Sequence, residues 1–339
     1  MGRRSRWFDD TRISSFHIIS KVTGGSFKLG DEDKEYFVNL MFKLARAYYV
    51  DISTFVVMSN HFHILLSNRQ EDVINASKAE LIGRYKDAFG KNAEHPEGSY
   101  IRDTFEIDYD DDGGTERLRR RLGSISRFVQ DLKQRFSKWY NKHHKNHTEA
   151  LWGNRFKSIK LSKGEAELIC SAYIDLNPVR AGMVKKPEDY RWSGIGLRVR
   201  NQRKAMKLLN NIYITKQTEI IHREPNTGII AKTETLSKTE KVTFSVYQSF
   251  VYKSGMVKRD GLAKIPEDAY NKSKSLFNRL GIGDNLMYRY RNISEGIAFG
   301  NYKLIADIQE KLGRVFIKPR KVIENGEEDF YSTRKLKPI

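Results

Sequence analysis

Two short hydrophobic segments separated by a polar dipeptide constrain the fold of this chain more than any other feature. Residues 52–57 and 62–66 are rich in β-branched and aromatic side chains, which are typical of strands. Residues 59–60, Ser-Asn, favour a tight turn between them. Side chains two positions apart on a strand point to the same face, so His61 and His63 project together. The sequence therefore predicts a β-hairpin that carries two imidazoles on one face.

The two imidazoles are the beginning of a divalent-metal site. Neutral imidazole binds transition metals and, together with oxygen ligands, harder ions. Paired histidines also occur on strands as surface or half-buried side chains that bind nothing. The pair by itself leaves both interpretations open.

Charge indicates what kind of partner the chain has. Its 339 residues, enough for two domains, hold 61 Lys and Arg against 42 Asp and Glu, a net charge of +19. Soluble proteins with such an excess commonly bind a polyanion such as nucleic acid. A ribosomal or membrane-surface role fits the same charge, so the balance alone does not decide between them.

Cysteine usage and hydropathy exclude several classes of protein. Cys170 is the single cysteine, which excludes a disulfide framework and a multi-cysteine zinc site. No run approaches the ~18 apolar residues of a membrane span, so we expect no membrane partner. No apolar signal core follows the basic first residues, and we expect a cytoplasmic protein.

The order of the first elements indicates an α+β fold. Residues 14–22 read as a strand, and His17 within it is interpreted as a partly buried strand histidine. A helix with apolar side chains at helical spacing begins near Asp31, and the histidine hairpin follows. No phosphate-binding glycine loop follows the first strand, which argues against a Rossmann fold.

Basic residues and aromatics recur in the middle of the chain. The hydrophobic periodicity that predicts helices and strands weakens over roughly 70–116, which we interpret as an insertion. A strongly amphipathic helix is predicted from about Ile125 to Tyr140. Candidate contacts to phosphates and bases flank it on both sides, and they are Arg117, Arg119, Arg120, Arg121, Trp152, Arg155 and Lys157. A solvated helix start is the alternative interpretation of the four arginines.

A second helix carries a possible nucleophile. It begins near Lys163 and stops at Asn177, because the residue before a proline avoids helical geometry. Tyr173 and Asn177 are four apart and share a face. If this helix packs beside the histidine strand, a metal could be held there and the tyrosine could attack a phosphodiester. The alternative is that Tyr173, which lies on the apolar stripe, is a core residue.

Several segments together resemble a known family. Residues 58–66 and 172–184, supported by 16–19, 152–158 and 190–193, are similar to the single-tyrosine HUH transposases, and within them to the branch called REP-associated tyrosine transposases. The resemblance covers roughly 10–195. It implies a ferredoxin-like antiparallel sheet with packed helices, the HUH endonuclease fold, in a domain over 1–196. We expect 197–240 to be a linker or irregular subdomain and 241–339 to be a small, basic, mainly helical C-terminal region.

The resemblance also implies a reaction. His61, His63 and Asn177 would bind Mg²⁺ or Mn²⁺, and Tyr173 would be the nucleophile. The reaction would cut single-stranded DNA near a hairpin, leave a 5′-phosphotyrosine and a free 3′-OH, and rejoin the strand. Arg155, Lys157 and Arg180 carry over only weakly as DNA contacts. A homodimer is one expected assembly and a monomer the other.

Two rival functions stay open at this point. The chain could be a nucleic-acid-binding protein that keeps the fold and no longer cuts. It could also be a metal-dependent nuclease that uses water, which would need His61 and His63 but would be indifferent to Tyr173.

Overall fold

The computed structural model describes residues 14–89, 112–144, 150–223, 230–256, 263–271, 298–312, 320–323 and 330–332. The chain divides into two compact units. Unit 1 comprises 1–160 and 188–210, and unit 2 comprises 161–187 and 211–339. This division differs from the boundaries predicted at 196 and 240, because the helix that carries Tyr173 belongs to the same unit as the C-terminal residues.

Unit 1 is built on an α+β motif. Its main elements, in chain order, are β1 (Ser15–Lys21), α1 (Asp31–Ala47), β2 (Val50–Val57), β3 (His61–Asn68), α5 (Ile125–His143) and β4 (Lys157–Leu161). The strands lie in the order β2-β3-β1-β4. A βαββαβ chain with this strand order is ferredoxin-like, so the predicted fold class is confirmed.

The strand pairings set which side chains share a face. β3 pairs antiparallel with β1 and with β2. The register between β2 and β3 shifts between Ile52 and Thr54. This irregularity adds one residue to β2, which is why Ile52 and Phe55, three positions apart, both reach the core.

The core of unit 1 lies between the sheet and helices α1 and α5. Alternate strand residues such as Phe62, Ile64 and Leu66 are buried in it, as strand periodicity requires. Phe37 from α1 and Phe136 from α5 meet with ring centroids 5.1 Å apart. The helix predicted from Ile125 begins there. Its first turn is capped by Ser124, whose side chain accepts from the backbone N–H of Arg127.

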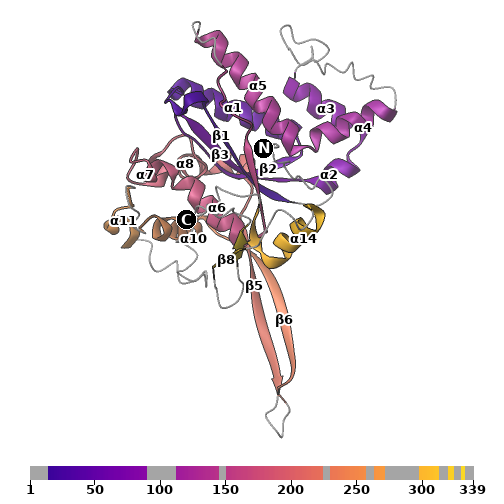
Figure 1. Cartoon of the computed structure of the whole chain (residues 1–339), viewed down its shortest axis with the longest axis vertical. Helices are drawn as coiled ribbons and strands as arrows, with labels where there is room; N and C mark the ends of the chain where they lie inside the picture. The colour runs from indigo at the N-terminus through magenta and orange to yellow at the C-terminus, as the bar shows by residue number, and fades with distance from the viewer. Residues whose placement is uncertain are drawn as a thin grey trace. The chain divides into compact units, whose positions relative to one another are not determined.

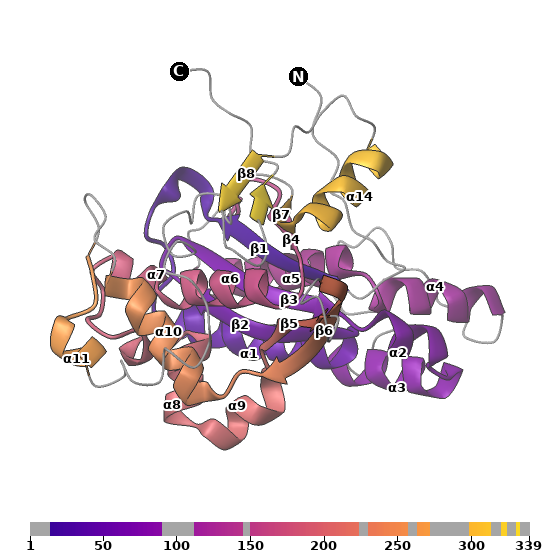
Figure 2. The same cartoon turned by 90° about the horizontal axis from the view of Figure 1, so that it is seen from below.

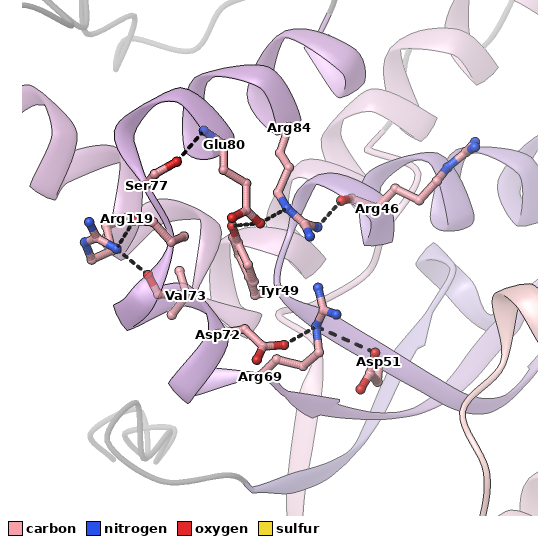
Figure 3. Close-up of polar contacts among 11 residues, drawn as sticks. Arg46, Tyr49, Asp51, Arg69, Asp72, Val73, Ser77, Glu80, Arg84 and Arg119 are labelled. Carbon is pink, nitrogen blue, oxygen red and sulfur yellow. Dashed lines mark hydrogen bonds and ion pairs between the residues drawn. The ribbon is translucent and has the colours of Figure 1, made fainter.

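The segment interpreted as an insertion folds in part into helices. They are α2 (Gln70–Asn75), α3 (Lys78–Phe89) and α4 (Asp112–Leu122), which gather at one end of the sheet (Figures 1 and 2). Figure 3 shows how they are attached. The Tyr49 hydroxyl donates to Glu80 at 2.8 Å, and Arg84 bonds the same carboxylate at 2.9 Å. Arg84 also donates to the backbone oxygen of Arg46, so α3 is tied to the end of α1. Residues 90–111 lie outside the described part.

Unit 2 contains the tyrosine helix and most of the C-terminal half. Its elements in chain order are α6 (Glu165–Asp175), α7 (Asn177–Arg180), β5 (Tyr213–Arg223), β6 (Ile230–Lys241), α10 (Phe244–Met256), α11 (Glu267–Asn271), β7 (Ala298–Asn301), α14 (Tyr302–Leu312), β8 (Arg320–Ile323) and β9 (Phe330–Ser332). β9 pairs antiparallel with both β7 and β8. From residue 241 onward, more of the described residues are helical than extended. The mainly helical character of 241–339 as a whole stays a prediction.

The expectation of a linker or irregular subdomain over 197–240 is wrong. Helices α8 (Gly194–Arg200) and α9 (Gln202–Leu208) occupy its start, and the strands β5 and β6 form a long antiparallel hairpin (Figure 1). The hairpin was missed because neither strand alternates cleanly between apolar and polar residues. A short helical turn, η2 (Pro187–Asp189), precedes α8.

None of the described helices combines the length and the apolar character that a membrane crossing needs.

Candidate metal site and nucleophile

The two histidines of β3 lie together, as strand alternation predicts. The ring centroids of His61 and His63 are 5.0 Å apart and their planes are nearly perpendicular, at 85°. The side chain of Phe62 between them is fully buried in the aromatic core. The imidazoles therefore occupy the face of the sheet opposite to α1 and α5.

The side chain of Asn60 fixes the tautomer of His61. Asn60 donates its amide N–H to the backbone oxygen of Gly25 at 3.1 Å, so its Oδ1 is the atom that faces His61. This oxygen can only accept, and it lies 2.6 Å from Nδ1 of His61. Nδ1 of His61 therefore carries the proton, and Nε2 carries the lone pair that a metal would use.

His63 is held by a third histidine. Nδ1 of His63 lies 2.8 Å from Nε2 of His17 on the neighbouring strand β1. The two rings stack, with centroids 5.0 Å apart and planes 24° apart. Since Nδ1 of His63 is used in this hydrogen bond, its Nε2 is the atom that would bind a metal, beside Nε2 of His61.

Burial keeps both rings of the pair neutral. It lowers the pKa of His61 to about 4, with a further lowering from the charge of Lys21. Burial also lowers the pKa of His63 well below 6.5, helped by the charges of His61, His17 and Lys21. Neutral imidazole is the form that ligates metal, so both side chains are ready to bind an ion at neutral pH without losing a proton.

His61 and His63 supply two nitrogen ligands, which do not by themselves complete a metal site. Within the described residues, no group of three or more His, Cys, Asp or Glu is placed to hold a metal. A site built on His61 and His63 thus needs its remaining ligands from other residue types, from water or from substrate. Two imidazole nitrogens with oxygen ligands fit Mn²⁺ and leave positions open for a phosphate.

Tyr173, the candidate nucleophile, is the least buried residue over most of its helix. In α6, every residue from Ala166 to Asp175 is buried except Tyr173, which is half-buried. A core tyrosine, the alternative interpretation of the sequence, would be buried like its neighbours Ala172 and Ile174. Tyr173 is thus less buried than the rest of this stretch, which favours the nucleophile over the core interpretation.

Asn177 is oriented by the tyrosine's own backbone. It begins α7, and one residue, Leu176, separates it from the end of α6. Its side-chain amide donates to the backbone oxygens of Tyr173 at 2.8 Å and of Ile174 at 3.3 Å. The donor end of the amide is therefore used within the helix, which leaves Oδ1 as the atom for a cation.

A buried polar contact holds the tyrosine helix in place. The hydroxyl of Tyr247 on α10 donates to the carboxylate of Asp175, and both side chains are buried. Gly255 on the same helix lies so close to Leu176 and Ile265 that a Cβ there would come within 2.8 Å of Leu176. Helix α10 thus packs tightly against the end of α6.

The structure brings the predicted residues together in two pairs. His61 and His63 form one pair in unit 1, and Tyr173 and Asn177 form the other in unit 2. The convergence of both pairs on a single ion stays a prediction.

Two of the four candidate DNA-binding arginines have structural contacts instead. The guanidinium of Arg119 donates to three backbone oxygens at the end of α2, those of Val73 (Figure 3), Ile74 and Ala76. Arg121 pairs with the buried carboxylate of Asp131 at 2.7 Å. These contacts favour a role in folding for both residues.

The other candidate contacts divide in the same way. Arg117, Arg120, Arg155 and Lys157 are exposed, and their contact with DNA stays a prediction. Trp152, expected to stack on bases, packs its ring against Phe37, Phe62 and Phe136. Arg180 is half-buried and donates to the backbone oxygens of Ser254 and Ala263. Trp152 and Arg180 are therefore better explained as structural residues.

Sequence reasoning missed the parts played by His17 and Asn60. His17 was interpreted as a partly buried strand histidine, whereas it is fully buried and bonded to His63. Asn60 was interpreted as a turn residue only. The available signal was its place directly before His61, from which an amide reaches the neighbouring ring. No local signal identified His17, because the register between two strands cannot be predicted from the sequence of either strand alone.

The fold and the paired imidazoles define an α+β protein whose ferredoxin-like unit carries a candidate metal site. No protein-family model matches the sequence, and no curated protein matches it either. Among solved structures, that of a REP-associated tyrosine transposase bound to a REP hairpin is similar over 60% of this chain and 87% of its own, at 15% sequence identity and a TM-score of 0.38. A TM-score this low supports no functional conclusion. Any proposal about function must therefore be argued from the residues of this chain.

Proposed function

We propose that this chain is a metal-dependent endonuclease and strand transferase of the HUH type, acting on single-stranded DNA with Tyr173 as the nucleophile. The observation that carries the proposal is the pair of neutral imidazoles on β3, each bonded through Nδ1 so that Nε2 is the ligand atom. A pair of histidines serving only to fill space would need no such orientation. The oriented amide of Asn177 beside Tyr173 supports it further.

The proposed ligands of the ion are Nε2 of His61, Nε2 of His63 and Oδ1 of Asn177. Mg²⁺ or Mn²⁺ bound there would withdraw charge from the phosphate oxygens and from the leaving 3′ oxygen. The protein's own part is to keep the imidazoles neutral through burial and to hold the amide oxygen toward the cation.

Tyr173 performs the proposed covalent step. Its phenol oxygen gives up its proton and attacks the phosphorus in line, forming a phosphotyrosine bond. The bond from phosphorus to the 3′ oxygen breaks, and that oxygen takes up a proton to become a free 3′-OH. Attack by another 3′-OH reverses the exchange and releases the tyrosine. No outside energy source is needed, because one phosphodiester bond is exchanged for another.

The proposed substrate is single-stranded DNA that contains a hairpin. The net charge of +19 supports a polyanionic partner. The exposed Arg117, Arg120, Arg155 and Lys157 are the candidate phosphate contacts. A homodimer and a monomer are both compatible with this proposal.

One assay separates the three candidate functions. The full chain is incubated with Mn²⁺ and hairpin-bearing single-stranded DNA, and products are resolved by denaturing gel electrophoresis. The proposal predicts a covalent protein–DNA adduct that is lost in Tyr173→Phe and in His61→Ala. Cleavage that survives Tyr173→Phe would instead support a nuclease that uses water. Binding without any cleavage would support a nucleic-acid-binding protein that no longer cuts.

A further inference from the structure

The buried contact between His17 and His63 arises from the register of β1 and β3. His17 lies opposite Leu65, and Ile19 lies opposite His63, so the two histidines are diagonal neighbours on one face. His17 is 0% exposed and His63 is 4% exposed. Their nitrogens are 2.8 Å apart, a normal hydrogen-bond distance. The bond satisfies one nitrogen of each buried ring and so offsets part of the cost of burying them.

The chemistry of this bond restricts how His63 can bind an ion. Between two neutral imidazoles, one nitrogen must donate and the other must accept. If Nε2 of His63 ligates an ion, its proton resides on Nδ1, and Nε2 of His17 must be the acceptor. The bond then fixes the tautomer and limits rotation of the His63 ring. Asn60 does the same for His61, with Oδ1 as the acceptor.

We propose that His17 is a positioning residue of the metal site, which holds His63 with Nε2 directed to the ion by accepting a hydrogen bond from Nδ1. This inference rests on the proposed function, since it assigns a role toward the same ion. Groups that bond the far nitrogen of a ligating histidine typically contribute 10- to 100-fold to metal affinity. His17 supplies this support from a neighbouring strand.

The test measures Mn²⁺ affinity of the full chain without DNA, by the electron paramagnetic resonance signal of the free ion. His17→Phe keeps a ring of similar size but cannot accept a hydrogen bond, and we expect Mn²⁺ to bind about 10- to 100-fold more weakly. His17→Gln retains an acceptor oxygen and should restore part of the affinity. Ile19→Val is the matched control, since it removes one methyl group on the same face and should leave affinity unchanged.

The outcomes separate this inference from the function it rests on. If His61→Ala weakens Mn²⁺ binding and His17→Phe does not, His17 has no positioning role and the proposed function stands. If the wild-type chain does not bind Mn²⁺, or binds it equally well without His61, the proposed metal site itself is wrong.

A second measurement needs no variant and decides the matter if His17→Phe does not fold. Long-range ¹H–¹⁵N correlation spectra of the wild-type chain with Mg²⁺ report which nitrogen of His63 carries the proton. We expect the Nδ1-protonated tautomer. The Nε2-protonated tautomer in the ion-bound protein would overturn the inference.

Discussion

The side-chain amide of Asn177 donates to the backbone oxygen of Tyr173, 2.8 Å away, and so couples the candidate ligand to the candidate nucleophile. Replacing Asn177 by alanine removes the proposed oxygen ligand, and we expect Mn²⁺ affinity to fall at least tenfold, together with adduct formation. Asn177→Asp loses the donor but keeps a ligand oxygen, so it should retain more metal affinity than Asn177→Ala. Isothermal titration with Mn²⁺ measures both. Equal affinity in wild type and Asn177→Ala would exclude this residue as a ligand.

Arg119 and Arg120 are adjacent in sequence and should respond differently to substitution. Arg119→Ala leaves three backbone oxygens at the end of α2 without their guanidinium partner, and should cost about 1–3 kcal/mol in the free energy of unfolding. Arg120 is exposed, so Arg120→Ala should leave stability unchanged.

We expect Arg120→Ala to weaken binding of single-stranded DNA and to reduce the slope of log affinity against log salt by about 0.7, the value for one lost phosphate contact. Urea unfolding and DNA titrations over a range of salt measure the two effects. Arg117→Ala provides a second exposed comparison. A stability loss in Arg120→Ala equal to that in Arg119→Ala would contradict the division between structural and exposed arginines.

The neutral histidines make stability depend on pH. The pKa of His61 is lowered to about 4 from 6.5, so between these values the unfolded chain takes up a proton that the folded chain does not. The contribution of His61 to the free energy of unfolding is fully present above pH 6.5. It is lost as the pH falls toward 4, at up to ~1.4 kcal/mol per pH unit. Burial also lowers the pKa of His63 well below 6.5, so this group acts in the same direction.

Urea unfolding at several pH values between 7 and 4 tests this dependence. His61→Gln does not titrate in this range and serves as the comparison. Its stability should fall less steeply with acid than that of the wild type. Parallel curves for the two proteins would show that His61 titrates normally in the folded chain.

The bond between Tyr247 and Asp175 should stabilise unit 2. Tyr247→Phe removes a donor from a buried carboxylate without changing the size of the ring, and should cost about 1.5–3 kcal/mol. Thermal unfolding of the variant measures the loss. Tyr213→Phe, at a side chain that is 40% exposed, is the control and should unfold like wild type. An unaltered midpoint in Tyr247→Phe would mean that the contact contributes nothing to stability.

The parts of the fold that depend on local pattern could be predicted from the sequence. Strand alternation placed His61 and His63 on one face, and helical spacing located α5 and α6, although α6 ends at Asp175 and not at Asn177 as predicted. The order of these elements was enough to indicate an α+β fold, whereas the ferredoxin-like sheet was expected only from the resemblance to the HUH transposases.

The parts that depend on contacts between distant residues could not be predicted. Helix α3 has little pattern of its own and is held by Tyr49 through Glu80, 31 residues away in sequence. The roles of Arg119 and Arg120 differ because consecutive helical residues point about 100° apart, and only the neighbouring helix decides which one is engaged. His17 reaches His63 across 46 residues through a strand register that neither segment encodes alone.

The most direct test of the account is to locate the covalent bond between protein and DNA. The full chain is incubated with hairpin-bearing single-stranded DNA and Mn²⁺, digested with protease and nuclease, and analysed by tandem mass spectrometry. We predict a nucleotide attached through a 5′ phosphate to the peptide that contains Tyr173, at that tyrosine. A nucleotide on any other residue, or cleaved DNA with unmodified Tyr173 throughout, would contradict the account.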